Sequence, residues 1–408
     1  MLPANFVLTS MALATASVIL YVRRRVRIIR LDSFYERLLW TFRSWRAGYP
    51  VPLDLDQWSL TDPANGDLYF KESRVALRAW KFLEPFFAAR GYILYHNQPG
   101  AGVFCLLPNP AGPKGHPSPS YPYASRVYKD DAEVEFSFGS LSAWPARDSE
   151  GREVVLKMVS GRTPSNELKV LQRLNTPKAR ADPRNHTIHA LDYVIFDGMV
   201  FVVMPRWPQA FRHDFGKVAE LFHFTEIIIE AFDFMHENRI AHCDFLEQNT
   251  GIDVIADLEA TYLEGLRDPS VTRYTIYDFN YSLIYPLETI LEDVRDTRFY
   301  HWGLRRLHTP TDPSVNPFEV DMAYVGGLLQ RYVRHIENLV PEIGPFFDSL
   351  TVTSDTGKPL TARQALQRIR DIKAGMSTEL LNTAVTTRYW RDGVVQTKLE
   401  YPIRLPRR

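Results

Sequence analysis

The feature that most constrains this sequence is a change of hydrophobic pattern about half-way along the chain. From about residue 123 to 204, apolar residues stand in short β-branched and aromatic runs such as REVVLKMV and MVFVVM. One helical stretch, SNELKVLQRLN, interrupts these runs. After about residue 215 the period becomes helical, starting with VAELFHFTEIIIEAFDFMHEN. The pattern predicts an α+β fold of two lobes, a small β-rich lobe followed by a larger helical lobe.

Composition excludes some classes of function. The 408 residues include 48 basic and 48 acidic side chains, so the formal net charge is zero. A protein that binds nucleic acid needs a basic surplus on one face, and we therefore expect no nucleic-acid partner. The two cysteines, Cys105 and Cys243, are too few for a disulfide framework or a cysteine metal cluster.

The N-terminus carries the strongest local bias. Residues 6–22 read FVLTSMALATASVILYV without a charge, and four arginines between residues 23 and 27 follow. This length reaches the lower limit of about 17 residues for a membrane-spanning helix. By the positive-inside rule, we expect residues 1–28 to anchor a single-pass membrane protein whose remaining chain is cytoplasmic. A cleaved signal peptide and a buried core helix are the alternatives.

The segment between this anchor and the β-rich part is predicted to be an extension. Residues 29–48 and 68–90 suit helices, and residues 98–122 are rich in proline, glycine and serine. We therefore place the main domain boundary near residue 122. The predicted units are, in chain order, an anchor with its basic flank (1–28), a helical extension and linker (29–122), the small lobe (123–206), the large lobe (207–375) and a C-terminal tail (376–408).

A short polar motif contains the first candidate catalytic residues. His242-Cys243-Asp244 is followed by Asn249, directly after an apolar helix. Phosphoryl transfer needs a carboxylate near the acceptor hydroxyl and an oxygen ligand for Mg²⁺, and Asp244 and Asn249 can supply these. Here the sequence resembles the eukaryotic protein kinase-like superfamily, in the manner of a divergent, fungal-type kinase domain. The catalytic loop of that family reads H-R-D-x-K-x-x-N.

Three further segments extend the resemblance. An apolar strand ends at Asp278-Phe279-Asn280, which is similar to the metal-binding D-F-G of kinases. Asn280 replaces the glycine, and asparagine tolerates left-handed backbone angles. Lys157 ends a strand similar to V-A-I-K, and Glu167 lies ten residues further on in a helix, where the family has the acid that pairs with this lysine. A solvated helix-face acid is the alternative for Glu167.

The resemblance also implies supporting residues. Met204 stands where the fifth strand meets the interlobe hinge and would contact adenine, and Gly139 would be the last glycine of the phosphate-binding loop. Asp321 lies in a segment similar to the buried helix of the large lobe and would brace the catalytic loop. Glu319 would pair with Lys358.

The resemblance therefore implies ATP and Mg²⁺ as cofactors and a defined set of site residues. The implied catalytic residues are Asp244, Lys157 and Glu167; the nucleotide contacts are Gly139, Lys157, Met204, Asn249 and Asp278; the metal ligands are Asn249 and Asp278.

Departures from the family pattern keep three functions open. Val134 and Phe136 stand where glycines are expected, and Leu246 stands where the catalytic loop has lysine. Cys243 replaces the arginine that meets an activation-loop phosphate. The sequence accordingly predicts an active kinase for Ser/Thr hydroxyls of an unidentified protein substrate, with a pseudokinase scaffold and a small-molecule kinase as alternatives.

Overall fold

The computed structural model divides into two compact units, Met1–Leu53 and Asp54–Arg408. The residues it describes are 38–46, 48, 51–52, 54–58, 66–97, 105–127, 134–137, 140–256, 263–298, 314–351, 357–385, 389–391 and 393–396. In the first unit, residues 38–46 form a helix, and the side chains of Leu38, Leu39 and Trp45 on it are exposed. Residues 29–37 of the predicted amphipathic helix lie outside the described residues.

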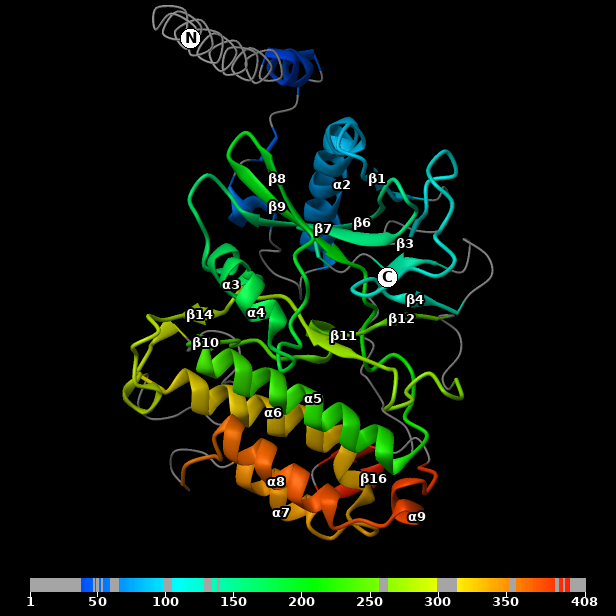
Figure 1. Ribbon diagram of the computed structural model, residues 1–408. Helices are drawn as coiled ribbons and strands as arrows, with labels where there is room; N and C mark the ends of the chain where they lie inside the picture. Colours follow the sequence, from blue (N-terminus) through cyan, green and yellow to red (C-terminus); the bar gives the residue numbers. More distant parts are fainter. Residues whose placement is uncertain are drawn as a thin grey trace, which may run out of the picture. The chain divides into compact units, whose positions relative to one another are not determined.

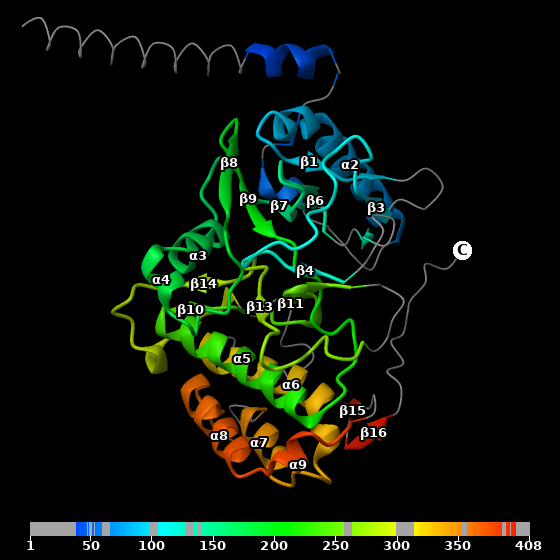
Figure 2. The ribbon, with the colours of Figure 1, turned by 45° about the vertical axis from the view of Figure 1, so that its right-hand side comes forward.

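The second unit contains a β-rich part followed by a helical part (Figures 1 and 2). Its first elements are η1 (Leu55–Trp58), α2 (Gly66–Ala88), β1 (Ile93–Leu94), β2 (His96–Asn97), β3 (Cys105–Leu107), β4 (Ser125–Arg126), β5 (Phe136–Ser137), β6 (Ala143–Arg147), β7 (Glu153–Ser160), α3 (Asn166–Leu174), α4 (Pro177–Ala181), β8 (Asp192–Phe196) and β9 (Met199–Pro205). The later elements are α5 (Val218–Glu237), β10 (Ile240–Ala241), η3 (Glu247–Asn249), β11 (Thr250–Ile252), β12 (Val254–Ile255), β13 (Tyr274–Ile276), β14 (Leu283–Ile284), η4 (Leu291–Asp293), α6 (Pro317–Val333), η7 (Arg334–Ile336), α7 (Ile343–Leu350), α8 (Ala362–Ala374), α9 (Thr378–Leu381), β15 (Tyr389–Arg391) and β16 (Val394–Gln396).

The small lobe is built on an antiparallel five-stranded sheet of order β1-β6-β7-β9-β8. Side chains alternate along β7 because successive residues of a strand point to opposite faces. Val155 and Lys157 line a cavity on one face, whereas Leu156 and Met158 are fully buried. Four strands predicted within residues 123–204, β6 to β9, thus form this sheet, and its edge strand β1 comes from further upstream, whereas β4 and β5 pair elsewhere.

Helix α2 belongs to this lobe rather than to a separate extension. Its fully buried Trp80 stacks on Trp144 of β6 at a centroid distance of 5.7 Å and lies edge-on to Phe201 of β9. The indole nitrogen of Trp80 also donates to the carbonyl of Leu141 at 2.9 Å. Helix α2 and the sheet therefore share one core, and the boundary expected near residue 122 lies within the compact unit Asp54–Arg408.

Residues 113–127, which we call the strap, run from the small lobe to the large lobe. At one end His116 N–H donates to Gly151 O at 2.8 Å, in the turn between β6 and β7. Gly151 has a φ of +79°, and a Cβ there would come within 1.9 Å of the carbonyl oxygen of Lys114, so this close approach requires glycine. At the other end β4 pairs in parallel with β12 of the large lobe, as Figure 1 shows.

The large lobe is a set of packed helices, with α5, α6 and α8 side by side in both ribbon views. Apolar residues occupy most of α5, and its partner α6 begins with the side-chain cap of Asn316, whose Oδ1 accepts from Phe318 N–H at 2.9 Å. The C-terminal tail adds the antiparallel hairpin β15–β16. Within it Gly393 has a φ of +83°, which the tight turn requires.

The described part of the chain changes one prediction about location. None of its helices is long and apolar enough to cross a membrane. The two longest, α2 and α5, carry charged residues along their length. The predicted single-pass membrane localisation is therefore not supported and is withdrawn, and residues 1–28, on which it was based, lie outside the described residues.

Candidate active site

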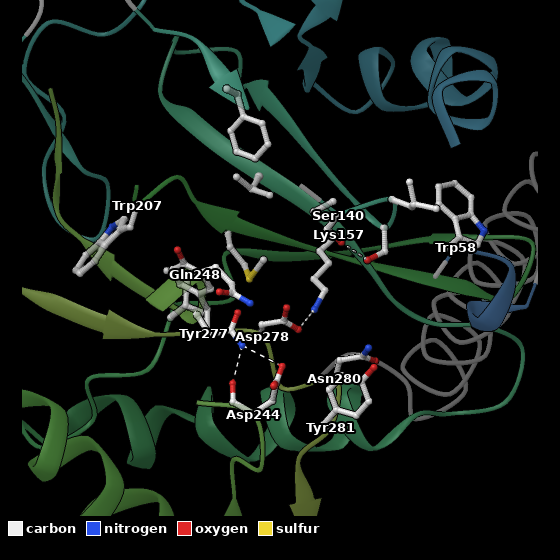
Figure 3. Close-up of a pocket in the computed structure, with 18 of the residues that line it drawn as sticks. Trp58, Ser140, Lys157, Trp207, Asp244, Gln248, Tyr277, Asp278, Asn280 and Tyr281 are labelled. Carbon is white, nitrogen blue, oxygen red and sulfur yellow. Dashed lines mark hydrogen bonds and ion pairs between the residues drawn. The ribbon is translucent and has the colours of Figure 1, made fainter. Parts of the chain in front are cut away.

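A cavity of about 480 Å³ lies between the sheet of the small lobe and the loops of the large lobe (Figure 3). Trp58 and Trp207 lie on opposite sides of the view, with Lys157 between them. Residues predicted to carry chemistry come to this one cavity from distant parts of the sequence. They are Lys157, Met204, Asp244, Asn249 and Asp278.

Lys157 holds two carboxylates at the inner wall of the cavity. Its Nζ donates to Glu167 Oε1 at 2.6 Å and to Asp278 Oδ1 at 2.7 Å. Burial opposes the charge of Lys157, but Asp278 and Glu167 outweigh this effect and raise its pKa. The ammonium group therefore stays charged in the site, as a contact to phosphate oxygens would require.

Glu167 reaches Lys157 from the first turn of α3, where Ser165 caps the helix by accepting from Leu168 N–H. Its side chain is buried, so the alternative of a solvated helix-face acid does not describe it. Burial raises the pKa of Glu167 to about 7. Its negative charge is consequently maintained mainly by Lys157.

Asp278 and Asn249 are neighbours because the strands beside them, β13 and β11, are paired. In this antiparallel pair Thr250 lies opposite Ile276, and Tyr277 N–H donates to Asn249 O at 3.0 Å. Lys157 holds the pKa of Asp278 below its usual range although burial opposes ionisation. Asp278 has a φ of +67°, so the left-handed residue of this turn is Asp278 and not Asn280 as the sequence suggested.

Asp244 and Asn249 lie in the loop of residues 242–249 and contact each other. The amide nitrogen of Asn249 donates to the carbonyl of Asp244 at 2.7 Å and to its Oδ2 at 3.2 Å. Burial, helped by the charge of Asp278, raises the pKa of Asp244 to about 7. A carboxylate with a pKa near neutrality is suited to accept a proton.

Asp321 fixes the start of this loop from inside α6. Its fully buried carboxylate accepts from His242 N–H at 2.7 Å and from Cys243 N–H at 2.8 Å. His242 in turn uses both ring nitrogens, since Nδ1 lies 3.3 Å from Asp244 N and Nε2 lies 3.1 Å from Tyr277 O. The imidazole therefore links the segment of Asp244 to the segment of Asp278.

The roof of the cavity differs from the predicted phosphate-binding loop. Gly139 lies outside the described residues. The strand next to β6 in the sheet is β1, and β5, which contains Phe136, pairs instead with β3. Phe136 lines the cavity, and Arg206 holds this segment by donating to Glu135 O at 2.6 Å. An aromatic side chain thus occupies part of the roof.

The hinge side of the cavity is formed by Met204, Pro205 and Trp207. Met204 is paired with Val155 across β7 and β9, which places both at the same depth of the sheet. The indole nitrogen of Trp207 donates to Pro122 O of the strap at 2.8 Å. Trp207, Gln248 and Tyr281 line the cavity although sequence reasoning did not select them, and only their positions beside Met204, Asn249 and Asp278 could have suggested them.

Comparison with known proteins gives limited information. No protein-family model matches the sequence, and no curated protein matches it. A solved structure of the Rad53 kinase domain and SCD2 is similar with a TM-score of 0.37 and 17% sequence identity. The match covers 59% of this chain and 91% of that chain. Similarity at this level is weak; the mixed α/β arrangement is consistent with a kinase-like two-lobe fold, and the assignments below depend on contacts within this chain.

Proposed function

We propose that this protein is a kinase that transfers the γ-phosphoryl group of ATP to a Ser or Thr hydroxyl of a protein. One observation carries the proposal. Lys157 is hydrogen-bonded to Glu167 and Asp278 on the same cavity that presents Asp244 and Asn249. Phosphoryl transfer needs a cation at the phosphates, oxygen ligands for Mg²⁺ and a base near the acceptor, and this set supplies all three.

The chemistry of the donor set fits Mg²⁺. Asp278 offers a carboxylate, of which Oδ1 contacts Lys157, and Asn249 uses its amide nitrogen as a donor, so its amide oxygen serves as acceptor. Mg²⁺ prefers oxygen ligands and completes its shell with phosphates and water. When bound, the ion would neutralise charge on the phosphates.

In the proposed reaction ATP lies with adenine at the hinge near Met204 and its phosphates towards Lys157. The acceptor hydroxyl oxygen forms a bond to the γ-phosphorus, and the bond from that phosphorus to the β–γ bridging oxygen breaks. The hydroxyl proton passes to the carboxylate of Asp244, and ADP leaves with the electron pair of the broken bond. Lys157 and the loop around Asp244 hold the two reactants in line.

A nucleotide-binding scaffold without transfer is the second candidate, and Leu246 favours it. A lysine at this position of a catalytic loop would place a cation near the transferring phosphate, and leucine offers none. Losing one such electrostatic contact typically costs about 3 kcal/mol of barrier. We therefore expect slow transfer if the protein is an enzyme.

Two measurements on the full chain test the proposal. Thermal unfolding with MgATP, and with ATP plus a chelator, should show stabilisation that depends on the metal. Transfer from labelled ATP should then appear with Ser/Thr peptides in preference to tyrosine peptides and small alcohols, and Asp244→Asn should abolish it. Metal-dependent binding without transfer would favour the scaffold, and absence of binding would refute the nucleotide site altogether.

A further inference from the structure

Arg173 connects the helix of Glu167 to the large lobe. It lies in the last turn of α3, six residues after Glu167 on the same helix. Its Nη1 donates to two carbonyls of the large lobe, that of Asn238 at 2.9 Å and that of Tyr285 at 2.7 Å. Asn238 ends α5, and Tyr285 directly follows β14. One guanidinium nitrogen thus joins the helix that orients Lys157 to the segment that follows Asp278.

The side chain of Tyr285 extends this connection. Its hydroxyl donates to Asp296 Oδ2 at 2.9 Å, and Arg298 Nε donates to Asp296 Oδ1 at the same distance. Asp296 also forms an antiparallel bridge with Val315, with N–H···O distances of 2.9 and 3.2 Å. The carboxylate of Asp296 therefore holds Tyr285, and its backbone holds Val315 just before α6.

The connection ends at the catalytic loop. Val315 precedes Asn316, the cap of α6, and Asp321 on that helix holds the backbone of His242 and Cys243. A hydrogen-bonded path therefore leads from α3, which carries Glu167, to the loop that carries Asp244. Cys243 lies beside this path, at the position where a switchable kinase would have an arginine.

We infer that Arg173 is a positioning residue for phosphoryl transfer, which keeps Glu167 against Lys157 by tying α3 to Tyr285 and Asp296. In this arrangement the contacts of the Asp296 carboxylate with Tyr285 and Arg298 need no phosphorylation. The inference rests on the proposed function for its effect on catalysis, but its effect on α3 can be measured separately.

The test compares four variants with the wild-type chain, each prepared free of phosphate and checked by mass spectrometry before the assay. Arg173→Ala removes both hydrogen bonds and should lower kcat about tenfold, as expected for loss of a charged hydrogen bond, with the KM of the acceptor unchanged. Arg173→Lys should restore part of the rate, because both bonds come from one nitrogen. Tyr285→Phe removes only the hydroxyl contact to Asp296 and should lower kcat less.

Arg162→Ala is the matched control. Arg162 also makes an ion pair, with Asp197 at 3.0 Å, but both side chains are exposed and lie outside the path. The kcat of the Arg162→Ala variant should equal that of the wild type. If Arg173→Ala fails to fold, Arg173→Lys and Tyr285→Phe still decide the question, since each leaves most of the local structure in place.

The outcomes separate the inference from the proposed function. A folded Arg173→Ala variant with wild-type kcat would overturn the inference, as would a wild-type rate that requires phosphorylation. If the wild type neither binds MgATP nor transfers phosphate, the proposed function fails. Hydrogen exchange of the α3 backbone amides, measured without ATP, then tests whether Arg173 ties α3 to the large lobe. Faster amide hydrogen exchange over residues 168–174 in Arg173→Ala than in Arg162→Ala would support the role of Arg173 in holding α3 against the large lobe. Equal exchange in the two variants would refute that role.

Discussion

Lys157 Nζ donates to Glu167 Oε1 at 2.6 Å, and both side chains of this ion pair are almost completely buried. Removing one partner of a buried pair leaves the other charge without compensation, at a cost of about 3 kcal/mol. We therefore expect Lys157→Met to lower the free energy of unfolding by about this amount at pH 8. The loss should be smaller at pH 6, where Glu167 can take up a proton. Urea unfolding at both pH values measures the effect, and Lys169→Met, an exposed lysine on α3, should have little effect.

The raised pKa of Asp244 predicts a pH dependence of activity and of stability. The base must be ionised, so the rate should rise with pH through about 7, the pKa of Asp244 in the folded protein. In the unfolded chain the pKa of an aspartate is about 3.9. Between these values the unfolded state loses its proton while the folded state keeps it, so folding becomes less favourable as pH rises.

Asp244→Asn should therefore stabilise the protein, and increasingly so from pH 4 to pH 7. Thermal unfolding across this range measures the difference from the wild type. A constant difference, or a destabilised variant at pH 8, would contradict the assigned pKa.

The carboxylate of Asp321 accepts hydrogen bonds from the backbone N–H groups of His242 and Cys243. Asp321→Ala would leave both without their acceptor in a buried place, at a cost of about 1–3 kcal/mol for each group. We expect urea unfolding to show a loss of about 3 kcal/mol. Asp321→Asn retains one oxygen acceptor and should lose less, and the exposed Asp293→Ala should be near neutral. Equal losses for Ala and Asn would count against the hydrogen-bond explanation.

The predicted pair of Glu319 and Lys358 is present but exposed. Lys358 Nζ lies 3.7 Å from Glu319 Oε1, and 71% of the lysine side chain is accessible. Exposed pairs contribute less than about 1 kcal/mol because water and salt screen them. A double-mutant cycle in urea should give a coupling below about 1 kcal/mol that decreases with added salt. A larger coupling would show that this pair is structurally important.

The contact of α2 with the sheet predicts that the small lobe needs residues before 123. Trp80→Ala should lower the free energy of unfolding by about 3–5 kcal/mol, because a large buried side chain leaves a cavity. Val75→Ala on the exposed side of α2 is the control and should change it little. A fragment of residues 123–408 should not unfold cooperatively in urea. Cooperative unfolding of that fragment would show that the sheet is complete without β1 and α2.

Local sequence signals predicted the parts of the site that depend on short motifs. Asp244 and Asn249 are held by one short loop, so that spacing along the chain nearly fixes their distance, and Asp278 closely follows the apolar strand that pairs beside Asn249. The two-lobe order could be predicted for the same reason, since alternating and helical periods are visible within a dozen residues.

Contacts between distant segments could not be predicted in this way. β1 pairs with β6 across an intervening stretch that includes the strap, and no local pattern identifies which strand another will join. The hydrogen-bond partners of Arg173 could not be predicted either, because they are the backbone carbonyl groups of Asn238 and Tyr285. A backbone carbonyl exists at every residue, so the sequence contains no sign that these two are used. The left-handed angle lies at Asp278 and not at Asn280, and the side chain of Asp278 is bound by Lys157 from a distant strand, a contact that no local pattern announces.

The strap also determines the order in which the chain can fold during synthesis. β1 leaves the ribosome before its partner β6 exists, and the strap carries Ser125, whose hydroxyl contacts the carbonyl of Asp253, 128 residues later. We therefore expect the strap to be still unpaired at β4 when β9, the last strand of the sheet to be synthesised, is complete. The strap has to wait for β12, so its final placement belongs to the docking of the two lobes rather than to the folding of the small lobe alone.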